Sequence, residues 1–273
     1  MLSKYSLIML FHQDLNEALK KRKVVKVIAG LSNFNLNTIF LIAKAAELGR
    51  ATYLDIAANV NILYQVKQVC SLPICVSSID IDELYSCFKA GADILEIGNF
   101  DIFYQKNIII NEQQLFNLAR TLRYRAPSSC ICVTIPHILN LSAQIKLAQR
   151  LESLGIDIIQ TEGISSQTKN NIQPIYALNN ASASLSSTSI LAQYIKIPII
   201  SSSSINALSA PIAISYGASG VGVGSCISQL TNCIQMTWII QSIVKSIDDN
   251  IILDIEKTDL LLSVLMDQCF SEI

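Results

Sequence analysis

Short apolar runs alternate with helix-like segments along almost the whole chain, and this alternation constrains the fold more than any other feature. The runs have the length and the isoleucine-rich composition of strands that are buried on both faces of a parallel sheet. We expect strands at Val24–Gly30, Ala51–Ala58, Pro73–Ser78, Ala92–Asn99, Cys130–Pro136, Asp157–Gly163, Ile197–Ser203 and Ala218–Ser225. We expect helices at Leu36–Leu48, Val60–Val69, Ile81–Lys89, Glu112–Tyr124, Leu141–Leu154, Ile175–Ile195, Ala207–Tyr216 and Ile227–Ile247. A glycine follows several of these helices and is predicted to end each of them in the left-handed conformation: Gly49, Gly91, Gly155 and Gly217.

Eight strand–helix units close naturally into a (β/α)8 barrel, the TIM-barrel fold. A doubly wound sheet is the alternative, but Gly30-Leu31-Ser32 lacks the glycine-rich turn that usually opens such a sheet. The chain has no linker or break in composition, so residues 1–273 are expected to form one domain. Its barrel would span about residues 24–247, with a leading helix in 1–23. A helical extension, 248–273, would pack its apolar face on the barrel or on a partner chain, so a homo-oligomer is possible.

Composition excludes several classes of partner. The 20 Lys and Arg residues are balanced by 21 Asp and Glu residues, which argues against nucleic-acid binding. The apolar runs are too short to span a membrane, and the N-terminus resembles neither a secretory signal nor a transit peptide. The 8 cysteines show no CxxC spacing and there are only 2 histidines, so we expect reduced, mostly buried thiols and no metal centre. Abundant isoleucine and asparagine suit an AT-rich organelle genome.

Small polar residues end the seventh and eighth strands. In a TIM barrel these two loops commonly form a phosphate site, because glycines let backbone N–H groups approach an anion. The sequence therefore predicts a phosphate site made of Ser202, Ser203, Gly222, Gly224 and Ser225. The alternative is close packing of small residues inside the barrel. Ser204 occupies a position where many such sites carry glycine, and its bulk would narrow the cradle.

Three charged residues interrupt strands that are otherwise apolar. Lys26 lies in the first strand, Asp55 in the second and Glu96 in the fourth. A buried lysine needs a carboxylate partner, and adjacent strands bring Lys26 and Asp55 within reach of each other. Such a lysine can have a lowered pKa and act as a base or a Schiff-base amine. The alternative is a structural ion pair, and Asp55 with Glu96 could hold Mg²⁺ weakly.

Further candidates lie where other strands end. His137 is a candidate general acid or base, and Glu162 a candidate base or ligand of a substrate hydroxyl. A surface histidine after a proline turn is an equally good interpretation of His137. The remaining candidates for ligand binding are Asn99, Thr134, Gln160 and Thr161.

Several of these segments together resemble the hypothetical chloroplast open reading frame number twenty-three family. The resemblance covers about residues 11–245. It rests on Phe11-His12-Gln13-Asp14, Lys26 through Leu31, Ala51 through Ala58, Pro73 through Ser78, Glu96 through Asp101, Thr134 through His137, Gln160 through Gly163, and Gly220 through Ser225. It implies a single TIM-barrel domain of unknown function, made inside the plastid. Ser204 departs from the family's usual glycine. More distantly, the chain resembles thiazole synthase and related sugar-phosphate barrels, an analogy of fold alone.

These observations favour an enzyme that acts on a small phosphorylated metabolite, as a lyase, isomerase or synthase, without a cofactor. The expected catalytic residues are Lys26, Asp55, Glu96, His137 and Glu162. The alternative is a non-catalytic barrel that senses a metabolite or binds a partner protein.

Overall fold

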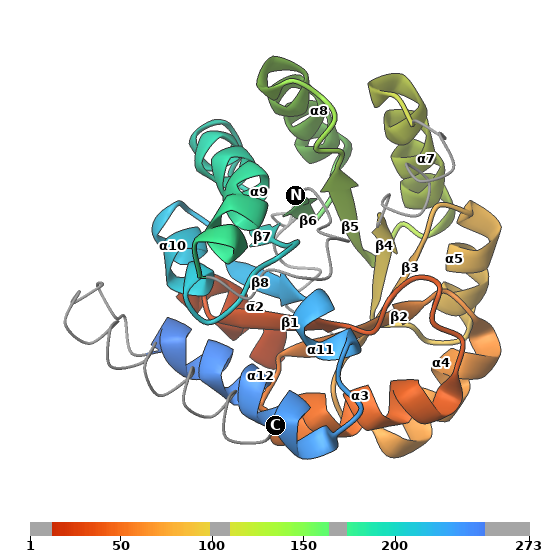
Figure 1. Cartoon of the computed structure of the whole chain (residues 1–273). Coiled ribbons are helices and arrows are strands. Elements are labelled where there is room, and N and C mark those ends of the chain that lie inside the picture. Colours follow the sequence, from red (N-terminus) through yellow and green to blue (C-terminus); the bar gives the residue numbers. More distant parts are fainter. Residues whose placement is uncertain (1–12, 99–109, 164–173, 249–273) are drawn as a thin grey trace.

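The computed structural model describes residues 13–98, 110–163 and 174–248, and within them the strands form a closed parallel barrel (Figure 1). Each strand pairs with its sequence neighbours, and the last pairs with the first. The strands are β1 (Val24–Ile28), β2 (Tyr53–Ala57), β3 (Ile74–Ser78), β4 (Ile94–Ile97), β5 (Cys130–Ile135), β6 (Ile158–Thr161), β7 (Ile199–Ser201) and β8 (Gly220–Val223). The TIM barrel expected from the sequence is confirmed.

Helices surround the barrel and return the chain from one strand to the next (Figure 1). They are α2 (Gln13–Lys21), α3 (Leu36–Leu48), α4 (Val60–Val69), α5 (Ile81–Lys89), α7 (Glu112–Arg125), α8 (Leu141–Leu154), α9 (Pro174–Tyr194), α10 (Ser209–Ser215), α11 (Ser225–Ser228) and α12 (Cys233–Asp248). Asn35, Asn59, Asn111 and Asn140 begin four of them, and each side chain accepts a backbone N–H of the first turn. Among the helices in the described ranges, none is both long enough and apolar enough to cross a membrane.

The inside of the barrel is built in two layers of opposite character. The lower layer, toward the amino ends of the strands, is apolar, and Leu15 and Leu19 of α2 close it. Its strand residues are Val24, Tyr53, Cys75, Ile94, Cys132, Ile158 and Ile200. Successive side chains of a strand alternate between faces, so the next inward position lies two residues further on. At that position six strands carry a polar residue, and a seventh polar residue directly follows β7: Lys26, Asp55, Ser77, Glu96, Thr134, Gln160 and Ser202. The polar layer therefore lies toward the carboxyl ends of the strands.

The left-handed conformation predicted for the glycine that ends α3 is wrong. Gly91, Gly155 and Gly217 do adopt left-handed φ values, but Gly49 has φ −77° and the following Arg50 has φ 62°. Glycine is required at position 49 because a larger side chain would not fit there. A Cβ atom added there would lie 2.5 Å from Cγ2 of Ile240, a buried residue of α12.

The expected helix Ile227–Ile247 is also wrong at its start, because the chain forms the short α11 and then a separate α12. The side chain of Asn232 accepts the N–H of Ile234 and begins the second helix. The leading helix is confirmed for α2. Residues 1–12, and 249–273 of the expected extension, lie outside the described residues.

The close approach at Gly49 predicts the sign of a stability change. Alanine suits φ −77° and favours helices more than glycine, so in open space Gly49→Ala would stabilise the protein. Because the new methyl group would press on Ile240, we expect a loss of about 1–3 kcal/mol in the free energy of unfolding. Urea denaturation measures it, and a gain in stability would contradict the packing of α12 against α3.

Candidate functional site

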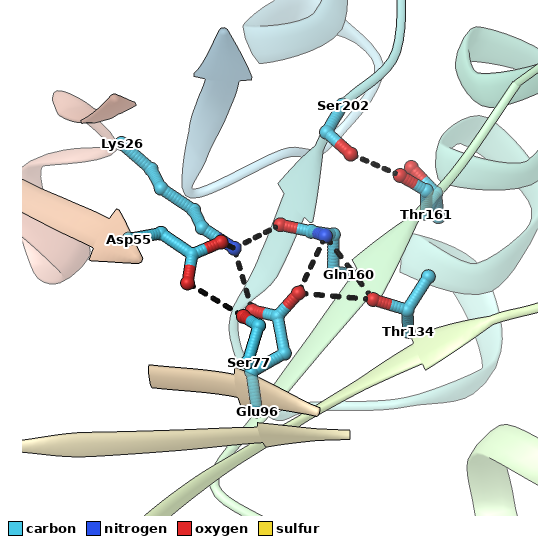
Figure 2. A network of polar contacts seen from close by, with 8 residues as sticks. All are labelled: Lys26, Asp55, Ser77, Glu96, Thr134, Gln160, Thr161 and Ser202. Carbon is cyan, nitrogen blue, oxygen red and sulfur yellow. Dashed lines mark hydrogen bonds and ion pairs between the residues drawn. The ribbon is translucent and has the colours of Figure 1, made fainter. Parts of the chain in front are cut away.

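Lys26 is the centre of a buried polar network in the upper layer of the barrel (Figure 2). Its Nζ lies 2.6 Å from Oε2 of Glu96, 3.0 Å from Oδ2 of Asp55 and 2.9 Å from Oε1 of Gln160. The contact with Asp55 was expected from adjacent strands. Glu96 and Gln160 reach the ammonium group from more distant strands, since all three side chains point into the barrel.

Hydrogen bonding in this network is saturated on the donor side. An ammonium group has three N–H bonds, and each bond of Lys26 has its own acceptor. The amide of Gln160 donates to Oε1 of Glu96 at 2.8 Å and to Oγ1 of Thr134 at 3.1 Å. The hydroxyl of Thr134 donates to Oε1 of Glu96 at 3.2 Å. Ser77 donates to Oδ1 of Asp55 at 2.5 Å.

This environment keeps Lys26 charged. Burial opposes the charge, but the carboxylates of Asp55 and Glu96 outweigh burial and raise the pKa of Lys26 well above its ordinary value. The lowered pKa that the sequence allowed for this lysine is therefore wrong. A Schiff base needs a neutral amine with an open approach, and Lys26 offers neither.

The pKa of Asp55 is raised as well, but for a carboxyl group this favours the neutral form. Burial raises its pKa to about 6, the positive charge of Lys26 opposes this rise, and the negative charge of Glu96 adds to it. A carboxyl group with a pKa near neutrality can both accept and return a proton at physiological pH. Asp55 is thus the side chain of the network best suited to acid–base chemistry.

A cavity of about 230 Å³ lies directly against the network. Its lining residues are Ile28, Ala29, Gly30, Asp55, Glu96, Thr134, Gln160, Glu162, Ser202, Ser203, Ser204, Gly224, Ser225 and Ser228. Both carboxylates that hold Lys26 line the cavity, whereas Lys26 itself is fully buried among its partners. The structure thus brings together most of the residues singled out in the sequence, at the carboxyl ends of the strands.

Serines and glycines of the seventh and eighth loops form the rim of this cavity. Ser203 and Ser204 both adopt left-handed backbone conformations, with φ 71° and 57°, which cost non-glycine residues energy. Ser202 lines the cavity, but its hydroxyl donates to the carbonyl of Thr161 at 3.0 Å. The helix that follows Gly224 is the single turn α11, much shorter than expected.

Some expected site residues lie elsewhere. Gly222 is absent from the cavity lining, and a Cβ atom there would lie 2.8 Å from Cβ of Ser202, so its role is close packing. The hydroxyl of Thr161 contacts Ser184 and Thr188 of α9. Asn99 lies outside the described residues.

His137 and Glu162 form a second polar pair. Oε1 of Glu162 lies 3.1 Å from the backbone N–H of His137 and 3.1 Å from its ring Nδ1. Glu162 lines the cavity, and His137 contacts it from the loop after β5. The histidine side chain is 16% exposed, so the pair is in contact with solvent.

Asp55, Cys75 and Glu96 could together be considered as metal ligands, because one ligand atom of each lies within 4.8 Å of the others. The ammonium of Lys26 already contacts both carboxylates, at 3.0 and 2.6 Å. A divalent cation would have to share that space with a fixed positive charge. The residues therefore fit a lysine-centred network better than a metal centre.

Sequence reasoning missed Ser77 and Ser228. Serine is common in and after strands, and neither residue stands out in a sequence without its neighbours. The inward register could have found Ser77, because it lies two residues after Cys75 in the same strand. Ser228 lines the cavity only because α11 ends there, and the sequence indicated a longer helix.

The fold and site together define a class: a (β/α)8 barrel with a polar, acid-lined cavity where barrel enzymes have their active sites.

The chain belongs to the family described as "Protein of unknown function (DUF561)", which matches residues 11–253. It is 42% identical over 259 residues to uncharacterized protein ycf23 of Antithamnion sp., covering 92% of this chain and 93% of the relative. The ycf23 protein of Cyanophora paradoxa is 38% identical over 248 residues, covering 89% of this chain and all of the relative. Such relatives come from plastid-bearing algae.

Solved structures share the fold at low sequence identity. Thiamine phosphate pyrophosphorylase from Pyrococcus furiosus has a TM-score of 0.57 and 15% identity, covering 85% of this chain and 99% of that one. A structure of 3-hexulose-6-phosphate synthase has a TM-score of 0.58 and 15% identity, covering 82% and 99%. Geranylgeranylglyceryl phosphate synthase from Thermoplasma acidophilum, in complex with substrate sn-glycerol-1-phosphate, has a TM-score of 0.57 and 12% identity, covering 86% and 98%. At these identities the likeness shows the fold alone.

Removing the charge of Lys26 should destabilise the protein strongly. Lys26→Met leaves two buried carboxylates without their cation, so we expect a loss of about 3–5 kcal/mol in the free energy of unfolding. Lys23→Met is the matched control, because Lys23 forms an exposed pair with Asp248 that should contribute less than about 1 kcal/mol. Chemical denaturation compares them, and equal losses would contradict the central place of Lys26.

The raised pKa of Asp55 predicts a pH dependence of stability relative to Asp55→Asn. Between pH 3.8, its ordinary value, and about 6, native Asp55 holds a proton that the unfolded chain has released. The native state binds more protons in this window, so the stability of the natural chain relative to the variant should fall as pH rises. Above about 6 the difference should be constant. Urea denaturation across this range measures it, and a rise with pH would show that the pKa of Asp55 is lowered.

Proposed function

We propose that the protein is an enzyme that acts on a small phosphorylated metabolite by proton transfer, in a reaction of the lyase, isomerase or synthase type. The observation that carries this proposal is the position of Asp55. Its carboxyl group lines the cavity, has a pKa of about 6 and is held in place by Lys26 and Ser77. A fixed carboxyl group that titrates near neutrality is what a general base needs.

The other charged residues take supporting roles around Asp55. Glu96 and Lys26 hold it and balance its charge, and Lys26 acts as a positioning residue because its three N–H bonds are all in use. Glu162 lines the cavity beside His137, and we assign this pair a second proton transfer. Two acid–base groups at one cavity allow a proton to be removed at one atom of the substrate and returned at another.

We assign the phosphate group to the rim formed by Ser203, Ser204, Gly224 and Ser225. Successive backbone N–H groups in turn conformations, together with serine hydroxyls, provide the donors that an anion requires. The two consecutive left-handed serines support this assignment, because strained backbone concentrates at ligand sites. The three barrels of similar fold named above are enzymes of phosphorylated compounds, which agrees with the assignment.

Relatives from plastid-bearing algae lead us to place the protein in the plastid. The proposed proton transfer involves only side chains, so it calls for no cofactor. A homo-oligomer remains a prediction.

A thermal-shift comparison of the natural chain with Gly224→Asp tests the phosphate assignment. Inorganic phosphate or a sugar phosphate at about 100 times its dissociation constant should add about 2.7 kcal/mol of stability to the natural chain. Gly224→Asp should lose this gain, because it places a negative charge at the rim. Gly91→Asp is the control away from the cavity. A Cβ atom there meets no atom within 4 Å, but its φ of 89° strains any side chain, so the shift of each protein is measured against its own form without ligand. Equal shifts in all three proteins would contradict the assignment.

Turnover separates an enzyme from a binding protein. Once a phosphorylated ligand is found, Asp55→Asn should still be stabilised by it while the conversion seen with the natural chain is lost. A natural chain that binds the compound and leaves it unchanged across a panel of phosphates would favour the alternative of a metabolite-sensing barrel.

A further inference from the structure

The donors of the network at the floor of the cavity are already in use, and this polarity specifies the ligand more closely than the fold does. We infer that the ligand is a phosphate monoester of a small polyol or sugar, with hydroxyl groups against the network at the cavity floor and no second anionic group. The floor is formed by Asp55, Glu96, Thr134 and Gln160, and the rim by the serines and glycine assigned above to the phosphate. The inference rests on the proposed function and extends it to a class of substrate.

The floor has used the donors of its hydrogen-bonding groups. Both amide N–H bonds of Gln160 and the hydroxyl of Thr134 are directed to partners within the network. Lys26, behind the floor, also spends its three N–H bonds there. Within the described part of the chain, the floor side chains therefore have only acceptor positions left for a ligand.

Acceptor capacity remains, and Asp55 has most of it. An ionised carboxylate has about four lone-pair positions. Asp55 uses two of them, for Ser77 and Lys26. Glu96 uses four, for Lys26, Gln160, Thr134 and the thiol of Cys132. A ligand group that meets this floor must donate hydrogen bonds, as a hydroxyl does.

The carboxylates that line the cavity also disfavour a second anionic group on the ligand. Asp55, Glu96 and Glu162 all line the cavity, and the positive charge of Lys26 is already shared between the first two. A ligand carboxylate placed on the floor would face like charges in a desolvated site and would lose affinity. The cavity volume of about 230 Å³ also favours a compact skeleton over a drug-sized one.

A matched series of three-carbon phosphates tests this inference by calorimetric titration of the natural chain at a pH above 7. Racemic glycerol phosphate carries hydroxyls beyond its phosphate, propyl phosphate carries none, and phosphoglycerate carries a carboxylate. We expect glycerol phosphate to bind about tenfold or more tightly than propyl phosphate, because the latter leaves buried acceptors unpaired. Phosphoglycerate should bind more weakly still.

Two variants test which side chains produce the preference among the three esters. Asp55→Asn keeps the shape of the side chain, removes its charge and adds a donor, so it should reduce the preference for glycerol phosphate over phosphoglycerate. Ser225→Ala removes a hydroxyl from the rim, so it should weaken all three esters and leave their ratio unchanged. Even if Asp55→Asn fails to fold, the order of affinities in the natural chain decides the question.

The possible outcomes separate this inference from the function on which it rests. Equal affinity for the three esters, or tightest binding of phosphoglycerate, would overturn the assignment of the floor and leave phosphate binding intact. Failure of inorganic phosphate and of every ester to bind would overturn both. The expected order, with its dependence on Asp55, would support both.

Discussion

The ammonium group of Lys26 is the constraint on which the upper half of the barrel depends. A lysine with no exposed surface loses its hydration, and only close opposite charges and hydrogen bonds compensate for that loss. The barrel provides them from three strands, with contacts of 2.6 to 3.0 Å. One cation in an inward position thus requires polar side chains at inward positions of other strands, both adjacent and distant. The layer above the apolar core is accordingly polar.

This arrangement also gives the cavity its character. Since the donors of the network are directed to its own members, the side of the network that faces the cavity has only acceptors left. Burial raises the pKa of Asp55 to about 6, while Lys26 keeps it from rising further. A single charged network therefore contributes to stability and places a titrating carboxyl group in the cavity. In our proposal the network also selects a ligand end that donates hydrogen bonds, and the serine-rich rim receives the phosphate.

Much of the fold could be predicted from sequence, because strands buried on both faces leave a simple pattern of apolar runs. Lys26, Asp55 and Glu96 could be identified because a charge inside such a run demands an explanation. Their full geometry could not be predicted in this way. Adjacency of strands leads only to Asp55, whereas Glu96 reaches Lys26 across the interior of a closed barrel.

Other features depend on contacts that a sequence pattern does not contain. Gly49 resembles an ordinary helix cap, yet it is small because Ile240 packs against it from the other end of the chain. The direction of the pKa shift of Lys26 depends on two carboxylates outweighing burial, which requires their distances. The break before α12 had a usable signal, since Asn232 is a good helix-capping residue.

The protonation state of Lys26 tests the central claim most directly. Nitrogen NMR of the folded protein, with the side-chain signal assigned by comparison with Lys26→Arg, reports whether Nζ is an ammonium or a neutral amine. As the pH approaches 10.5, the ordinary lysine value, exposed lysines lose their protons, and Lys26 is expected to keep its proton while the fold persists. A neutral Lys26 amine at physiological pH would contradict the saturated network and restore Schiff-base chemistry as an explanation of this site.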